Sequence, residues 1–215
     1  MKRIFLLVKP YYLYVYDELE CPYPTIYNLN VKADSYAVDG NKVHFVGRYG
    51  TDLEFSMLNL GGKKFRFGEF NVRMASSSSF NPPDKFYHQH QLHVDGAPYE
   101  NFASILVPHR NTINCSVEND SETGGAIVRY PGMTERAMVF PKLERVEAGN
   151  MVFHGLAGSI REEKDKTTFM LAAGDSIGLN GNLIFEGDGP FTAVLDGNGK
   201  LNVESDGVAR WLKIK

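Results

Sequence analysis

Three histidines lie close together in the segment Tyr87–Asp95. Side chains alternate between the two faces of a strand, so His88 and His90 should point one way and His93 the other. Two imidazoles at this spacing can bind one metal ion when a third ligand comes from elsewhere. Apolar Leu92 shares their face, which favours a structural role for both histidines at the rim of the core. A third alternative is that they contact a sugar. We therefore predict no metal site and keep His88 and His90 as metal candidates.

Alternating tyrosines form a second pattern. Tyr12, Tyr14 and Tyr16 would share one face of a strand. A tyrosine combines an apolar ring with a polar tip, which suits stacking on a sugar ring. The alternative is packing between sheets. The preceding run Ile4–Val8 is continuously apolar, so we favour packing and keep the three tyrosines as sugar-contact candidates.

Two basic clusters could meet the carboxylate of a uronate sugar. Arg66 follows Lys63 and Lys64, and Arg110 follows His109. A guanidinium group presents a planar fork of donors that matches a carboxylate. Arg66 and Arg110 are therefore sugar-contact candidates. The alternative is that they are solvated surface cations, which is the commoner case.

No catalytic residue is predicted. Asp17 and Glu18 are adjacent, so on a strand they point to opposite faces and cannot act as a pair. The sequence has no nucleophile elbow, metalloprotease motif, phosphate loop or dinucleotide fingerprint, and no cofactor is expected. The formal net charge of −3 gives no general attraction to nucleic acid or an acidic membrane. No apolar run approaches the ~20 residues of a membrane span, and the N-terminus has no signal-peptide pattern.

Tight-turn dipeptides divide the sequence into short segments. Asp-Gly and Asn-Gly pairs tolerate the positive φ angles of hairpin turns; they occupy residues 39–40, 95–96, 180–181, 188–189, 196–197, 198–199 and 206–207. The segments between them are alternating or continuously apolar, and no helical stripe exceeds ten residues. This pattern predicts an all-β protein, an antiparallel β-sandwich built as a stack of sheets.

The length of 215 residues fits one large β domain or two small ones. We predict a single sandwich domain over residues 1–215, with a small terminal sheet layer at 174–215. The run Ile4–Val8 should be a strand covered on both faces. Phenylalanines on both sides of Gly68 change register, which predicts a bulge at Gly68-Glu69. Ser76–Pro83 should be a surface loop, with a linker between domains as the alternative. Cys21 and Cys115 could form one disulfide, but two unlinked thiols are favoured.

The opening segment Arg3–Leu19 reads R-I-F-L-L-V-K-P-Y-Y-L-Y-V-Y-D-E-L. It resembles the paired strands R-x-x-L-F-V-K-P-x-Y-x-x-V-x-D-E-L in the β-sandwich domain of heparinase II/III-like polysaccharide lyases. The turn Val38–Val43 and the later segments Gln91–Val94 and Phe102–Pro108 are similar to the same domain. The resemblance is most specific over residues 3–60.

The resemblance implies a C-terminal β-sandwich portion that supports or walls a sugar cleft and is not catalytic alone. In that family an α/α toroid and an upstream histidine carry the active site, in a periplasmic or secreted parent. A structural metal there uses a histidine shortly before a D-G-N turn, which Asn28–Val31 lacks. The implied partners are an acidic polysaccharide, the upstream catalytic domain and another copy through an exposed strand edge. The alternatives are a free-standing carbohydrate-binding or structural β module, and an enzyme using His88 and His90.

Overall fold

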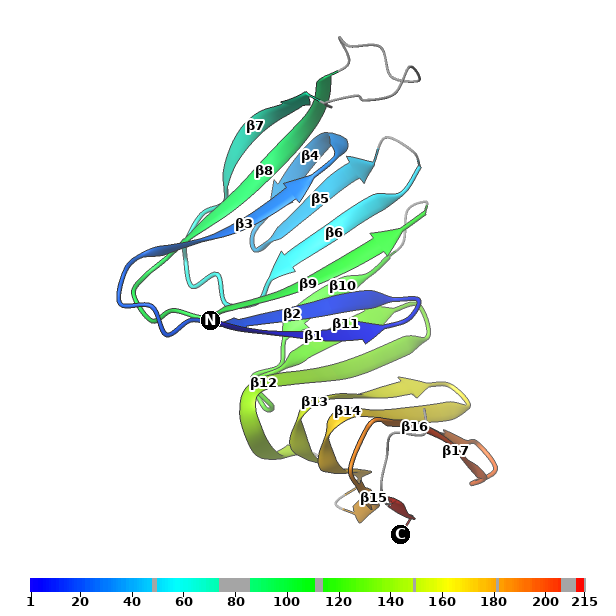
Figure 1. Ribbon diagram of the computed structural model, residues 1–215. Helices are drawn as coiled ribbons and strands as arrows, with labels where there is room; N and C mark the ends of the chain where they lie inside the picture. Colours follow the sequence, from blue (N-terminus) through cyan, green and yellow to red (C-terminus); the bar gives the residue numbers. More distant parts are fainter. Residues whose placement is uncertain are drawn as a thin grey trace. The chain divides into compact units, whose positions relative to one another are not determined.

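The computed structural model describes residues 1–47, 50–73, 86–110, 114–148, 150–180, 182–205 and 212–214. The regular structure in these ranges consists of β-strands in several antiparallel sheets (Figure 1), which confirms the all-β, sandwich-like prediction. Within the same ranges, no helix is long and apolar enough to cross a membrane. The chain divides into two compact units, one mainly Asp17–Thr112 and the other mainly Ile113–Lys215 with parts of the N-terminal strands. The single domain over 1–215 and the terminal layer at 174–215 remain predictions.

The first unit is a sandwich of two sheets. In one sheet β9, β6, β5 and β4 are neighbours, and β3, β8 and β7 form the other. Inward side chains from both sheets share one core, including Tyr27, Phe45, Phe55, Leu92 and Phe102. The strands are β3 (Thr25–Val31), β4 (Ala33–Asp39), β5 (Lys42–Gly47), β6 (Asp52–Met57), β7 (Arg66–Arg73), β8 (Phe86–Gly96) and β9 (Phe102–His109).

Turn chemistry sets part of this register. β4 and β5 pair up to Asp39 and Lys42, and the two-residue loop between them contains Gly40 at a φ of 58°. Glycine adopts this angle without steric cost, so the hairpin predicted at Asp39-Gly40 is confirmed. The Asp95-Gly96 pair behaves differently, because Gly96 ends β8 in register with Thr25.

The expected bulge at Gly68-Glu69 is wrong. β7 pairs with β8 in unbroken register from Arg66 opposite His93 to Arg73 opposite Phe86. Phe67 therefore keeps its place against the core, and residues of even number in β7 face away from it near the start of the strand. The predicted loop at Ser76–Pro83 lies outside the described residues.

The second unit contains one large antiparallel sheet in which β10 to β15 follow in sequence order and β18 pairs with β15. β16 pairs with the first half of β14 and with β17. The strands are β10 (Ser116–Asn119), β11 (Ala126–Tyr130), β12 (Met133–Ala148), β13 (Met151–Glu163), β14 (Lys166–Leu179), β15 (Asn182–Gly187), β16 (Phe191–Asp196), β17 (Leu201–Ser205) and β18 (Leu212–Ile214).

The central strands are longer than their apolar segments predict, and their pairing contains register shifts. β13 shifts register against β14 between His154 and Gly158. The buried Phe153 directly precedes this shift. A side chain at Gly158 would place its Cβ 2.7 Å from the Phe153 ring, so glycine is needed there for the close approach.

The N-terminal strands β1 (Lys2–Val8) and β2 (Tyr12–Glu18) are neighbours, and β1 lies at the end of the strand order. In β1, Leu6 and Val8 are buried, whereas Phe5 and Leu7 are 58% and 55% exposed. The expectation that this strand is covered on both faces is therefore wrong. Self-association through this edge stays a prediction, and sedimentation would test it.

Candidate functional site

The outward face of the β3–β8–β7 sheet carries a set of hydrogen-bonding side chains, and we call it the polar face. Tyr27 and Leu92 point into the core, so the alternate residues of these strands point outward. Cross-strand register places Asn28 opposite His93, Asn30 opposite Gln91, and His93 opposite Arg66. The polar face is made of Asn28, Asn30, Arg66, Gln91, His93 and Asp95, with Gly68 between them and the exposed Ile26 opposite Asp95.

The polar face is accessible and rich in donors and acceptors. Asn28 and Asn30 are exposed, and Gln91 and His93 are partly buried. Gly68 has no side chain beside them; a Cβ there would lie 3.5 Å from Gln91 Oε1 and 3.7 Å from His93 Nε2. Each amide offers two N–H donors and one carbonyl acceptor, so the row can bind several hydroxyl groups of an extended ligand.

Arg66 forms a charged fork at one end of the polar face. Its Nε donates to Asp95 Oδ2 at 2.8 Å and its Nη2 donates to Asp95 Oδ1 at 2.5 Å. The hydrogen bonds from Arg66 hold the pKa of the exposed Asp95 carboxyl below its usual value, and the nearby His93 adds to this effect. The predicted sugar-contact residue Arg66 thus already holds a carboxylate in the geometry that a uronate would adopt.

Two exposed tyrosines lie at the same end of this sheet. Thr25 begins β3 and Gly96 ends β8, and the two residues pair. The loops that precede β3 and follow β8 therefore leave the sheet together. The Tyr99 N–H donates to the Cys21 carbonyl at 2.8 Å and ties the loops to each other.

These loops present aromatic surface to solvent. Tyr23 is 72% exposed and Tyr99 is 65% exposed. Tyr99 also has a φ of 61°, in the left-handed region that is uncommon for a residue with a side chain. An exposed tyrosine ring offers an apolar face for a sugar ring and a hydroxyl for hydrogen bonding.

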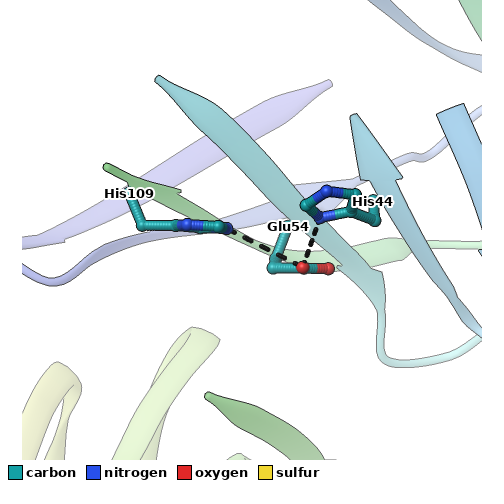
Figure 2. A group of neighbouring side chains, drawn as sticks. All are labelled: His44, Glu54 and His109. Atoms are coloured by element: carbon teal, nitrogen blue, oxygen red, sulfur yellow. Dashed lines mark hydrogen bonds and ion pairs between the residues drawn. The ribbon is translucent and has the colours of Figure 1, made fainter. Parts of the chain in front are cut away.

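A separate cluster of two histidines and a carboxylate lies on the β5–β6–β9 sheet (Figure 2). His44 on β5 is directly opposite Glu54 on β6. On β9, His109 is opposite Asp52, two residues from Glu54 on the same face. Figure 2 shows the two imidazole rings on either side of the Glu54 carboxylate.

The distances in this cluster are short. His44 Nδ1 is 2.6 Å from Glu54 Oε1, and His109 Nε2 is 3.7 Å from the same oxygen. One nitrogen or oxygen atom from each of the three residues lies within 4.8 Å of the other two. Side chains of this type at this separation can hold a metal ion.

The predicted sugar-contact tyrosines are placed differently from the loop tyrosines. Tyr12 and Tyr14 are each only 1% exposed, and Tyr16 is partly buried. Burial raises the pKa of Tyr14 well above its usual value, with a smaller contribution from Tyr16. The ring of Tyr14 is therefore kept neutral, and the positions of Tyr12 and Tyr14 favour packing over sugar contact.

Of the remaining candidates, two lie on β8 and the others lie outside the strands. His90 is buried and meets the ring of Tyr36 edge-on at 5.1 Å. The backbone of His88 pairs with Asn71, and its side chain lies outside the described residues. Arg110 is exposed just after β9. Cys21 and Cys115 are not joined in a disulfide bond.

Sequence reasoning missed Tyr23, Tyr99 and the cluster on β5, β6 and β9. A signal for His44 and Glu54 existed, since hairpin pairing of their segments could have placed them opposite each other. His109 is far away in the sequence and gave no such signal.

Comparison with known proteins assigns no family to the chain. No protein-family model matches the sequence, and no similar curated protein is found. What remains to indicate a function is the arrangement of the side chains and the resemblance of residues 3–60 to the β-sandwich domain of heparinase II/III-like lyases.

Proposed function

We propose that the chain is the C-terminal β-sandwich portion of a heparinase II/III-like polysaccharide lyase, where it lines one wall of a cleft for an acidic glycan. The polar face is the observation that carries this proposal. It combines amide groups from neighbouring strands with the guanidinium of Arg66. The resemblance of Arg3–Leu19 to the paired strands of that family supports the assignment. The parent protein would be periplasmic or secreted.

Each part of the polar face has a role in this proposal. A uronate carboxylate takes the place of Asp95 on the Arg66 fork, because both are planar acceptors of two parallel hydrogen bonds. Asn28 and Gln91 bind sugar hydroxyls through their amides. Tyr99 stacks on a sugar ring at the end of the sheet.

The chain alone is proposed to be inactive. A lyase removes a proton from the carbon next to the uronate carboxylate, which requires a positioned base and a group that stabilises the developing charge. In the proposed family those groups come from the toroid and an upstream histidine. Tyr14 is only 1% exposed and burial raises its pKa, so its hydroxyl stays protonated and out of reach of a sugar.

The test measures binding and cleavage on the same chain. Oligosaccharides of heparin, heparan sulfate, alginate and chondroitin are titrated into the protein by calorimetry. The absorbance of the unsaturated uronate product is followed in parallel. At least one acidic glycan should bind without product formation, and Asn28→Ala or Tyr99→Ala should weaken binding.

A matched control comes from Asn202 on β17, which is also an exposed strand asparagine. Asn202→Ala should leave glycan affinity unchanged. Equal loss in Asn28→Ala and Asn202→Ala would contradict a role for the polar face. Cleavage by the wild-type chain, abolished by changing one of its histidines, would contradict the proposed inactivity.

A free-standing carbohydrate-binding module is the second candidate, because the polar face lies within one compact unit. Both functions predict glycan binding by the chain. They differ in the residues encoded upstream of Met1. A toroid there, with lyase activity that weakens in Asn28→Ala, supports the lyase, and its absence supports the module.

A further inference from the structure

The cluster His44, Glu54 and His109 contains a donor set that the polar face does not use. Two imidazole nitrogens and one carboxylate oxygen converge from three adjacent strands. Because the strands are paired through regular ladders, the side chains are positioned by the sheet itself. This arrangement is independent of the proposed function.

We propose that His44 Nδ1, Glu54 Oε1 and His109 Nε2 bind a zinc ion. Zinc–nitrogen and zinc–oxygen bonds are about 2.1 Å long, so tetrahedral ligand atoms lie about 3.4 Å apart. The separation of His109 Nε2 from Glu54 Oε1 is 3.7 Å, which is close to this value. His44 Nδ1 is 2.6 Å from Glu54 Oε1, so these two groups separate by less than one ångström when the ion replaces their hydrogen bond.

A second carboxylate lies near the partly exposed His44. Asp52 Oδ2 lies 3.8 Å from His44 Nε2, on the side of the ring opposite Glu54. Asp52 is itself held in place, because its Oδ1 accepts the Gly47 N–H at 2.8 Å. Zinc-binding histidines commonly have a carboxylate at their other ring nitrogen, which fixes the tautomer and the ring orientation.

The donor types and their exposure define the site further. Imidazole nitrogens favour zinc and similar transition metals over magnesium and calcium, which prefer oxygen. The side chains of His44 and Glu54 are 35% and 28% exposed, while that of His109 is 2% exposed. The ion is therefore anchored from the buried side, and its fourth position faces solvent, where water completes the tetrahedron.

The test uses the 215-residue chain after removal of metals with a chelator. Zn²⁺ is titrated against a chromophoric chelator, and Co²⁺ is added separately as a spectroscopic probe. One equivalent of Zn²⁺ should bind, and Co²⁺ should give the intense visible bands of a tetrahedral site. Glu54→Gln and His44→Gln should abolish stoichiometric binding, and Asp52→Asn should weaken it by roughly 10–100-fold.

A matched control is His154 in the second unit. Its Nδ1 lies 2.8 Å from Asp175 Oδ1, so it forms the same kind of histidine–carboxylate pair. Within the described ranges the three-residue grouping occurs only at His44, Glu54 and His109. His154→Gln should therefore leave zinc binding unchanged, as should His90→Gln.

A folding control accompanies each variant, because His109 is buried. Circular dichroism should match the wild type, and Zn²⁺ should raise the melting temperature of the wild type and of His154→Gln but not of Glu54→Gln. Absence of stoichiometric zinc in the wild type would overturn the site. Binding that survives Glu54→Gln but is lost in His90→Gln would place the metal elsewhere.

Discussion

Gly96 lies against the core residue Phe102, beside the loops of the proposed binding surface. It ends β8 opposite Thr25, where the two tyrosine loops leave the sheet. A Cβ at this position would lie 2.6 Å from Phe102 Cζ and 2.7 Å from Thr25 Oγ1. Phe102 is 4% exposed and belongs to the core, so its ring cannot move aside into solvent. We expect Gly96→Ala to lower the free energy of unfolding by about 1–3 kcal/mol, the usual cost of overpacking.

Gly68 on the neighbouring strand is the control for this substitution. A Cβ there meets its nearest atoms at 3.5 Å, in ordinary contact. Gly68→Ala should therefore be neutral or stabilise the fold by up to about 1 kcal/mol, because alanine restricts the unfolded chain. Urea unfolding followed by circular dichroism measures both effects. Equal stability of Gly96→Ala and the wild type, or an equal loss in both variants, would show that the Cβ of residue 96 does not clash with Phe102.

Three further predictions concern charge and secondary structure. Glu135→Gln removes the buried carboxylate that pairs with Arg161, so it should destabilise the second unit by about 3 kcal/mol in urea unfolding. Glu118→Gln breaks an exposed ion pair and should lower the free energy of unfolding by under about 1 kcal/mol. Equal losses in the two variants would contradict this prediction. Arg66 lowers the pKa of the Asp95 carboxyl in the folded protein. The stabilisation from this pair is therefore present above the pKa that Asp95 has in the unfolded chain, and it is lost as the pH falls through the pKa of the folded protein. Carboxyl NMR titration should show the lowered pKa of Asp95 and its rise in Arg66→Ala. The circular dichroism spectrum should be that of a β protein, and a strong helical signal would contradict the fold.

Local sequence signals were sufficient to predict the fold class and the positions of some turns. Glycine at position 40 fixes a hairpin, and the alternation in β5 and β6 places Phe45 and Phe55 in the core. Strand ends and bulges were harder to predict. The apolar positions around Gly68 are compatible with a shift in register, and only pairing with β8 shows that the strand is regular. The exposure of Phe5 likewise depends on what packs against β1, which the strand's own sequence does not contain.

Predicting the candidate sites would have required knowing how distant segments pair, even more than predicting the fold did. Arg66 could be proposed from its residue type, but its fork with Asp95 requires the register of β7 against β8. Tyr99 gave no periodic signal because it lies in a loop. His109 reaches Glu54 only through the pairing of β6 with β9. Long-range strand pairing is not encoded by local propensity, so these groupings could not be predicted from single-sequence patterns.

We propose that the polar face binds an acidic glycan. Amide chemical-shift mapping of the chain during titration with uronate oligosaccharides tests this claim most directly. We expect shifts concentrated on β3, the start of β7, the end of β8 and the loop containing Tyr99, and no shifts on β17. Shifts concentrated in the second unit, or none with any of the four acidic glycans, would contradict it.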